Sequence, residues 1–492
     1  MKYHPQNDYM WDAWVVPHNE ELHLFHLQTR ISDGQPPEKG WGHAISRDLL
    51  HWEEKPAVLA ATGTPQDRLY RYTGSTVRYK GLFYTFFVLR DGWGNQRIGV
   101  STSEDLYHWN DHPDPVLEPD PALFLGYEPH GVDWMNVDCR DMLVIEAPEG
   151  GFYGYFVAVK ADGDHRGVIG VAYSEDLLHW RDQRIAFTSP FVGVAEAMDI
   201  FPLNGRWVMT LLTAPNYGSR HALSDPALQR GEIFAVADSP VGPFVTDSAD
   251  NVFIGGPNDS GFTCRTVDFK GQKRLIYLET NRGEGVLTLP KTVTMDDKGR
   301  PRVYYAADLL SSLRQEAISP HITAQPPCSF AWKIYGGKWQ KNDGLLHIET
   351  APNSWQAALF DGFGQNLEVC GHFSGDASAW GFVFYECAPD GTPNGFFFGD
   401  GRRVAVMAEP KLGKVSVVSL YDWTPLAVRH VSLDPEGFSL RVMKVDHTLD
   451  IYVNDELVLN AGVDMAEWTI PGCFADDGSV MLSDIGLWRL ED

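Results

Sequence analysis

The chain has 492 residues, more than one hydrophobic core usually holds, so we expect two domains. Its 40 basic and 66 acidic residues give a net charge of −26, which argues against nucleic acid or an anionic membrane as a partner. Neutral ligands with many hydroxyl groups remain possible. The aromatic content of 12% suits both β-sheet packing and stacking against sugar rings.

A seven-residue repeat is the first feature along the chain. Its copies are SRDLLHW at 46–52, SEDLYHW at 103–109 and SEDLLHW at 174–180, with a weaker copy, VADSPVGPF, at 236–244. The tryptophans of the three clear copies lie 57 and 71 residues apart. Such spacings, with several short strands between copies, are typical of a β-propeller.

Each copy of the repeat is expected to shape a turn. Its serine and aspartate can accept hydrogen bonds from nearby backbone N–H groups, its leucine packs inward, and its His-Trp pair closes the neighbouring sheet. Because chemistry is not needed three times over, we assign the carboxylates of the repeat to structure. They are Asp48, Glu104, Asp105, Glu175 and Asp176.

Short apolar runs such as GLFYTFFVL and GRWVMTLLT, opened by glycine and closed by turn residues, predict strands between the copies. Helical periodicity occurs only around 306–316. The first domain should span 1–308 and be followed by a polar, proline-bearing linker at 309–325. From 326 to 492, short alternating strands predict an antiparallel β-sandwich that braces the first domain or binds sugar. The fold class is all-β.

The repeat also helps to locate candidate catalytic acids. A propeller places the first strand of each blade against its central channel, so such acids should lie about one blade before the repeat. Counting back 34, 33 and 43 residues from the serines of three copies reaches Asp12, Asp141 and Glu196, each in strand-like sequence. Three carboxylates from three blades could converge on one funnel. The alternative is that each caps a turn or pairs with a basic residue.

Around these acids the chain resembles glycoside hydrolase family 32, the invertase and fructanase family, whose fold is a five-bladed β-propeller followed by a β-sandwich. The resemblance is carried by KGWGHAISRDLLHWEEKPAVL at 39–59, YTGSTVRYKGLFYTFF at 72–87 and GVLTLPKTVTMDDKGRPRV at 285–303. The later FSLRVMKVDHTLDIYVNDELVL resembles the sandwich strands of the family. The resemblance implies the same fold and a glycoside hydrolase activity.

The three family motifs that carry chemistry are altered here. Trp-Met-Asn-Asp-Pro-Asn-Gly becomes YMWDAWVV, which keeps Asp12 and is more similar to the Trp-Asp-Ser-Trp of family 68. Arg-Asp-Pro becomes CRDML, with Arg140 and Asp141, and Glu-Cys becomes EAMDIFPL, with Glu196 and Ala197. The acids are kept while their neighbours differ, which favours an enzyme acting on an unusual furanoside.

The residues that would contact the sugar differ more from the family pattern. The sugar-binding glutamine of the family aligns with Leu27, unless Gln28 takes its place through a local shift. Tryptophans near the acids could stack on a sugar or pack in the core, and hydroxyl groups could bind it or shape a turn. The candidate substrate-binding residues are Trp14, Gln28, Trp41, Thr73, Ser75 and Arg140, with His26, His43 and Asp199 as further candidates.

By the resemblance, Asp12 is the nucleophile, Glu196 the acid/base, and Asp141 accepts hydrogen bonds from sugar hydroxyls. Retention of configuration requires the carboxyls of Asp12 and Glu196 to lie about 5 to 5.5 Å apart. Glu196 must be protonated near neutral pH, which its apolar sequence neighbours favour, whereas Asp141 should stay ionised beside Arg140.

The expected activity is therefore a retaining hydrolase that removes terminal β-fructofuranosyl residues from small oligosaccharides. A transfructosylase, an inverting arabinofuranosidase similar to family 43 and a non-catalytic sugar-binding propeller remain alternatives. The oligomeric state stays open, a homo-oligomer included.

No metal or other cofactor is expected. The acids of EPHGVDWMNVDCRD at 128–141 are crowded but lack the regular spacing of a calcium loop. Six scattered cysteines show neither zinc nor disulfide spacing and read as free thiols. The N-terminal sequence has no apolar segment typical of a signal peptide, and no run approaches the roughly 18 apolar residues of a membrane span. We therefore expect a cytoplasmic protein.

Overall fold

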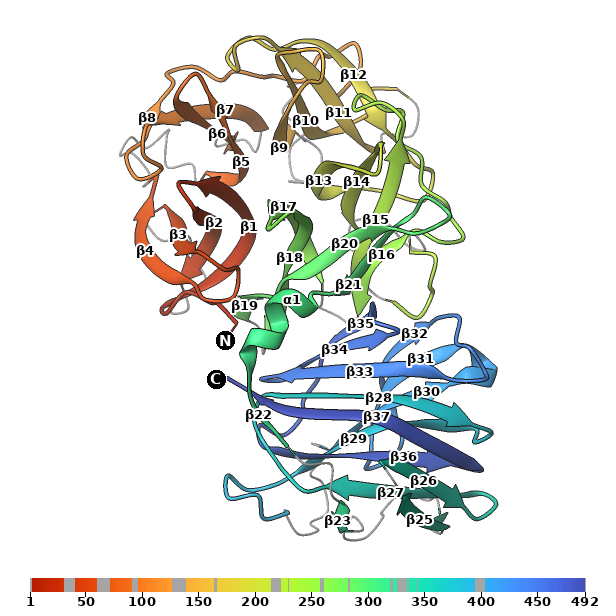
Figure 1. Ribbon diagram of the computed structural model, residues 1–492. Helices are drawn as coiled ribbons and strands as arrows, with labels where there is room; N and C mark the ends of the chain where they lie inside the picture. Colours follow the sequence, from red (N-terminus) through yellow and green to blue (C-terminus); the bar gives the residue numbers. More distant parts are fainter. Residues whose placement is uncertain are drawn as a thin grey trace.

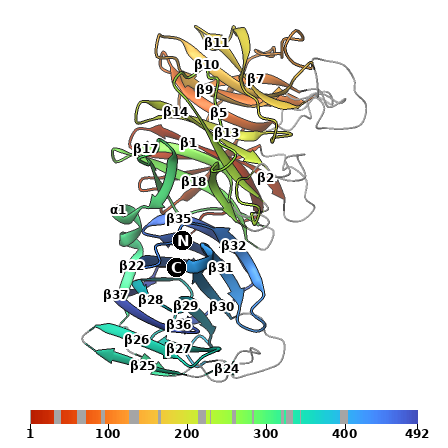
Figure 2. The same ribbon diagram turned by 90° about the vertical axis from the view of Figure 1, so that its right-hand side faces the viewer.

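The computed structural model describes residues 2–30, 40–59, 71–90, 96–125, 139–162, 166–213, 223–228, 230–256, 261–281, 284–318, 322–324, 334–335, 337–342, 344–393 and 403–491. Strands dominate this part of the chain (Figure 1), which confirms the all-β class. An upper part of small sheets lies above a lower part of two large sheets (Figures 1 and 2).

The upper part begins with four antiparallel sheets of four strands, each built from consecutive strands. The first holds β1 (Asp8–His18), β2 (Glu21–Arg30), β3 (Trp41–Ser46) and β4 (Glu53–Val58). The second holds β5 (Tyr72–Tyr79), β6 (Leu82–Arg90), β7 (Gln96–Ser103) and β8 (Asn110–Asp111). The third holds β9 (Cys139–Glu146), β10 (Phe152–Val159), β11 (Gly167–Ser174) and β12 (Arg181–Phe187). The fourth holds β13 (Glu196–Leu203), β14 (Arg206–Thr213), β15 (Arg230–Ala237) and β16 (Val252–Gly256).

A fifth group follows, with β17 (Phe262–Phe269), β18 (Gln272–Asn281), β19 (Glu284–Leu287), β20 (Lys291–Met295) and β21 (Pro301–Tyr305). It belongs to a 13-stranded sheet, which it joins through the pairing of Tyr304 with Glu456. The first strands of the five groups contact one another in a ring, in the order β1, β5, β9, β13, β17 and back to β1. Near the start of the chain, Tyr3 pairs with Leu287 of β19.

The repeat forms the same turn in each of the first three sheets, between the third and fourth strands. In the second copy, Ser103 accepts a hydrogen bond from the N–H of Leu106 (2.8 Å), and Asp105 accepts from the N–H groups of Tyr107 and His108 (both 2.8 Å). Leu106 is buried with φ of 69°, and its equivalents Leu49 and Leu177 have φ of 68° and 71°. The structural role predicted for the repeat is confirmed.

The tryptophans of the second and third copies pack against the preceding sheet. Trp109 meets Phe25 of the first sheet edge to face at 6.2 Å, and Trp180 meets Phe86 of the second sheet in the same way at 5.8 Å. The prediction that this residue closes the neighbouring sheet is confirmed for these two copies. The second and third sheets are thereby each attached to the sheet before them.

The lower part is a sandwich of two sheets. One continues the 13-stranded sheet with β35 (Glu456–Gly462), β34 (Thr448–Val453), β33 (Phe438–Val445), β28 (Leu367–Gly375), β37 (Ser479–Leu490), β26 (Leu345–Thr350) and β25 (Gly337–Asn342). The other holds β23 (Ile322–Ala324), β27 (Ser354–Phe360), β36 (Thr469–Asp476), β29 (Ala379–Glu386), β30 (Val404–Glu409), β31 (Lys414–Ser419) and β32 (Pro425–His430), with β24 (Ile334–Tyr335) beside β27. Their facing apolar side chains form the largest buried cluster.

The expected helix is shorter than predicted. Helix α1 (Ala307–Leu310) continues as a 3₁₀ turn over Ser311–Leu313 and then gives way to β22 (Arg314–Ala317). Strand β22 pairs with β37 and β23 pairs with β27, so strands of the sandwich begin within the segment expected to be a linker.

Five of the six cysteines are free thiols in the structure, as expected, and Cys328 lies outside the described residues. Within the described ranges, no helix has the length and hydropathy needed to cross a membrane.

Candidate active site

The three acids located from the sequence lie together. Asp12, Asp141 and Glu196 come from β1, β9 and β13, the first strands of three different sheets, and all three line one cavity of about 300 Å³. Two candidate substrate-binding residues, Thr73 and Arg140, line the same cavity. The ring of first strands is what brings residues so distant in sequence to one place.

A β-bulge interrupts every one of these first strands at the same level. Each bulge adds one residue to its strand, and the residues of the bulges are Asp12 in β1, Thr73–Gly74 in β5, Asp141–Met142 in β9, Ala197–Met198 in β13 and Thr263–Cys264 in β17. A bulge breaks the alternation of a strand and turns a side chain toward a new direction. Asp141, Ala197 and Thr263 have φ of 54°, 48° and 54°, which costs a non-glycine residue about 1–3 kcal/mol each. The site is thus built from strained bulges.

Asp12 is held by two hydroxyl groups from neighbouring strands. Thr263 of β17 donates to its Oδ1 at 2.8 Å, and Thr73 of β5 donates to its Oδ2. Both oxygens of the carboxyl are therefore fixed in direction while the side chain remains partly exposed to the cavity.

Arg140 pairs with Glu196 rather than with its sequence neighbour. Its Nη2 and Nε lie 2.7 and 3.1 Å from Oε1 of Glu196, whereas its Nε is 3.9 Å from Asp141. The carboxyl of Asp141 instead accepts the backbone N–H of Ala197 at 3.0 Å. The apolar setting predicted for Glu196 is therefore wrong, because the fold places a guanidinium against it.

The expectation that Asp141 stays ionised is also wrong. Burial raises the pKa of Asp141 to about 7, because Arg140 offsets it only in part and the negative charges of Glu196 and Asp12 add to the rise. The cavity can hold a proton close to two further carboxylates.

The two tryptophans proposed to stack on sugar lie in the core. Trp14 is 3% exposed and donates to Thr76, and Trp41 is 1% exposed and packs edge to face against Trp14 at 4.6 Å. The aromatic residue of β1 that lines the cavity is Trp11, which is 37% exposed. The extra residue Asp12 changes which side chains of the strand face the cavity, so a count of alternate positions from Asp12 selects the wrong tryptophan.

Gln28 does not take the place of the family glutamine. It donates to the carbonyl of Gly40 at 2.9 Å and lines a separate pocket with His26, and His43 also borders that pocket. Leu27 lines the cavity of the three acids instead. The local shift considered for Gln28 is therefore wrong, and an apolar side chain stands at this position.

The two remaining polar candidates serve the framework. Ser75 donates to the carbonyl of Met142 at 2.6 Å and so joins β5 to β9. Asp199 accepts both the N–H and the hydroxyl of Thr266 at 2.7 Å and joins β13 to β17. Neither lines the cavity of the acids.

Several residues that line the cavity were not predicted from the sequence: Trp11, Tyr72, Gln96, Leu212, Arg230 and Phe262. The guanidinium of Arg230 lies over the ring of Phe262 at 4.6 Å and brings a second cation to the cavity. Thr263 was missed because the fifth group has no copy of the repeat from which to count back.

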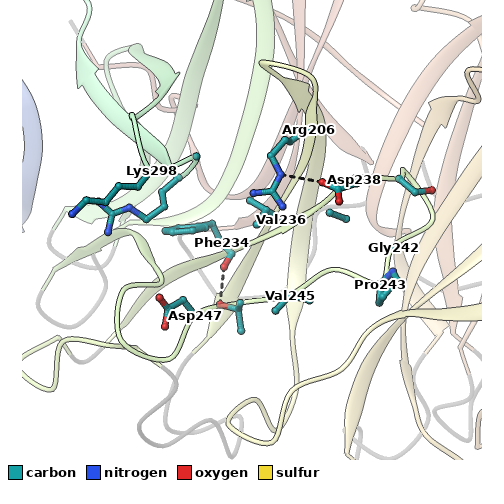
Figure 3. Close-up of a pocket in the computed structure, with 14 residues that line it drawn as sticks. Arg206, Phe234, Val236, Asp238, Gly242, Pro243, Val245, Asp247 and Lys298 are labelled. Atoms are coloured by element: carbon teal, nitrogen blue, oxygen red, sulfur yellow. Dashed lines mark hydrogen bonds and ion pairs between the residues drawn. The ribbon is translucent and has the colours of Figure 1, made fainter.

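A larger cavity, of about 780 Å³, lies between the fourth sheet and the turn from β20 to β21 (Figure 3). Arg206, Asp238, Asp247 and Lys298 are its charged residues together with Arg300, and Arg206 lies 3.3 Å from Asp238. None of the three acids lines it.

The calcium site considered from the sequence is not tested by the structure. The segment considered for calcium, with Glu128, Asp133 and Asp138, lies outside the described residues. No group of three or more potential metal ligands occurs in the part of the chain that the structure describes.

Comparison with known proteins finds a family match over the N-terminal part of the chain. Residues 3–237 match the glycosyl hydrolases family 32 N-terminal domain. A levanase from Bacillus sp. (strain L7) is 29% identical over 255 residues, which cover 46% of this chain and 24% of the levanase. A fructan 6-exohydrolase from Triticum aestivum is 24% identical over 357 residues, covering 65% of this chain and 58% of that protein. The chain thus matches about a quarter and somewhat over half of these two relatives.

Solved structures share the fold over the full length. The exo-inulinase from Aspergillus awamori superimposes with a TM-score of 0.69 at 15% identity, covering 100% of this chain and 98% of that chain. Fructan 1-exohydrolase IIa from Cichorium intybus, solved in complex with 1-kestose, gives 0.69 at 15% identity, covering 100% and 97%. Residues 3–237 thus match the N-terminal domain of glycosyl hydrolases family 32, and the whole chain shares the fold of these solved structures.

Proposed function

We propose that this protein is a retaining glycoside hydrolase that releases terminal β-fructofuranosyl residues from small oligosaccharides. The observation that carries the proposal is the convergence of Asp12, Asp141, Glu196 and Arg140 in one cavity of about 300 Å³. That volume lies at the small end of ligand pockets, which typically begin near about 300 Å³, and suits a single sugar unit. Two relatives are named a levanase and a fructan 6-exohydrolase, and these names support a fructosyl substrate.

The five groups of strands correspond in this proposal to the blades of a five-bladed propeller, whose ring of first strands forms the catalytic funnel. The catalytic domain would occupy 1–308, and the sandwich at 326–492 would brace its fifth group through the shared sheet.

The nucleophile in this proposal is Asp12. Its carboxylate oxygen forms a bond with the anomeric carbon while the glycosidic C–O bond breaks, and Glu196 gives its proton to the departing oxygen. A water molecule then loses a proton to Glu196 and displaces the sugar from Asp12, which restores both groups and the original configuration. The hydroxyls of Thr73 and Thr263 suit Asp12 to this role because they fix the direction of its oxygens.

The surroundings of Glu196 indicate where its proton is held before reaction. Arg140 contacts Glu196, and the nearby Asp141 has a pKa raised to about 7 by burial. We infer that Asp141 holds a proton near neutral pH, and that hydrogen bonds from sugar hydroxyls to Asp141 favour its transfer to Glu196.

The test is turnover of a panel of fructosides and arabinosides, with NMR identification of the first-formed anomer. We expect hydrolysis of fructosides with retention, and its loss in Asp12→Asn. Asp8→Asn is a matched control, since Asp8 lies on the same strand but does not line the cavity.

Other outcomes identify the alternatives. Inversion of configuration or activity confined to arabinosides would favour a function similar to family 43. Transfer to added sugars in preference to water would favour a transfructosylase. Binding of furanosides with no turnover of any of them would contradict the proposal.

A further inference from the structure

Behind the cavity, one buried guanidinium ties two of the strained bulges together. Arg265 of β17 is 4% exposed, and its Nη1 donates to the carbonyls of Ala197 (2.8 Å) and Met198 (2.9 Å). These two residues form the bulge of β13. The same Nη1 lies 3.0 Å from the carbonyl of Cys264, in the bulge of β17.

Each of these bulges also contacts or adjoins proposed catalytic carboxylates. In β13, Glu196 directly precedes Ala197, whose N–H donates to Asp141 at 3.0 Å. In β17, Thr263 directly precedes Cys264 and donates its hydroxyl to Asp12 at 2.8 Å. Arg265 therefore affects the positions of all three acids indirectly, through the bulges that it contacts.

Glu232 secures the same bulge of β17 from β15. Its side chain is fully buried, and its Oε1 accepts the N–H of Cys264 at 2.5 Å. The N–H and the carbonyl of Cys264 are thus each fixed by a buried charged residue. Neither Arg265 nor Glu232 lines the cavity, so neither is placed to touch the substrate.

These contacts are suited to holding an unfavourable backbone. Ala197 and Thr263 both have positive φ, and such residues persist only where the surrounding structure fixes them. We propose that Arg265 and Glu232 are positioning residues, which hold the bulges of β13 and β17 so that Asp12, Asp141 and Glu196 point at one sugar. This inference rests on the proposed hydrolase function.

The first experiment is Arg265→Lys, which keeps the charge but presents a single nitrogen instead of a planar fork. We expect kcat on a fructoside to fall about 100-fold with KM changed less than about threefold, because displacement of catalytic groups by about 1 Å has an effect of this size. Arg274→Lys is the matched control. Arg274 is also on the fifth group and fully buried, but it donates to Thr292 and Asp308 away from the cavity.

Glu232 gives a pair of variants with opposite expectations. Glu232→Gln keeps an oxygen that can accept the hydrogen bond from the N–H of Cys264, so this variant should retain most of kcat. Glu232→Ala has no such oxygen and should lose most of kcat. Equal kcat for Arg265→Lys and Arg274→Lys would overturn the role of Arg265, and equal kcat for the two Glu232 variants would overturn that of Glu232. If Arg265→Lys does not fold, the Glu232 pair decides.

A readout independent of turnover separates this inference from the proposed function. Loss of the hydrogen bond from Ala197 should raise the pKa of Asp141 in Arg265→Lys, measured by ¹³C NMR of labelled aspartate and assigned with Asp141→Asn. If the wild-type protein hydrolyses no furanoside, the hydrolase function fails, but a raised pKa would still support the positioning role. An unchanged pKa would overturn it.

Discussion

The turns formed by the repeat and the bulges of the first strands are both short, irregular segments. Each of the three turns has an aspartate and a leucine at positive φ, and in the bulge of β9 Asp141 has both features. In the turns, Asp105 accepts hydrogen bonds from its own segment, from the N–H groups two and three residues later. In the bulges, Asp12 and Asp141 accept from other sheets. The hydrogen bonds of Asp105 are therefore local, whereas those of Asp12 and Asp141 join different sheets.

The electrostatics of the two kinds of segment differ in the same way. Slight burial raises the pKa of Asp105, but the hydrogen bonds from His108 and Tyr107 outweigh it and hold that pKa well below its usual range. Burial raises the pKa of Asp141 to about 7, and one backbone N–H and one arginine do not compensate for it. The turn is stabilised by its acid, whereas the bulge is destabilised by the charge that it brings into the interior.

The largest expected effect tests the division of acids directly. Glu196→Gln should lower kcat on a fructoside by about 10²- to 10⁴-fold, because the leaving oxygen loses its proton donor. Glu175→Gln, in the third copy of the repeat, should leave kcat unchanged, since Glu175 pairs at the surface with Arg181. Steady-state kinetics of both variants provide the measurement, and equal losses in the two would end the distinction between turn and bulge acids.

A core substitution in a turn should change stability without changing chemistry. Leu106→Ala removes a fully buried side chain and should lower the free energy of unfolding by about 2–5 kcal/mol. Urea denaturation measures it, with Leu412→Ala, at an exposed position, as the control. A change in kcat per folded molecule would show that this turn reaches the active site.

The raised pKa of Asp141 predicts a particular pH dependence of stability. Its folded value of about 7 lies above the ordinary value of 3.8, so between about pH 4 and 7 the folded state binds more protons and loses stability as pH rises. Asp141→Asn should remove this loss and be more stable than wild type at pH 8 by about 0.5–2 kcal/mol. Denaturant unfolding at pH 5 and pH 8 checks it. Identical slopes of stability against pH in the two proteins would show that the pKa of Asp141 is not raised in the folded state.

The smallest effect is expected from the turn acids. The pKa values of Asp105 and Asp176 are lowered in the folded state, so their contribution is present above about pH 4 and is lost as the pH falls further. Both side chains are about half exposed, and we expect less than about 1 kcal/mol from each. The double variant Asp105→Asn, Asp176→Asn should lose less stability than wild type between pH 5 and pH 3 in urea titrations. A steeper loss would contradict the stabilising role of these carboxylates.

The first copy of the repeat also contacts the end of the sandwich. His51 bonds Asp48 at 2.7 Å, as its equivalents bond theirs, but its Nε2 also lies 2.5 Å from Glu491 at the end of the sandwich. The three copies, which are similar in sequence, therefore have different surroundings, and the seven residues alone do not show this.

The sequence by itself determined the all-β class, the turns of the repeat and the positions of the three acids, because these depend on local hydrogen bonding and on regular spacing between sheets. Only the tertiary structure decided that Trp11 rather than Trp14 reaches the cavity, that Arg140 turns to Glu196, and that Thr263 and Arg265 support the acids. The physical reason is the bulge. One extra residue reverses which side chains face inward, and its partners come from strands far away in sequence, so periodicity along a single strand carries no record of it.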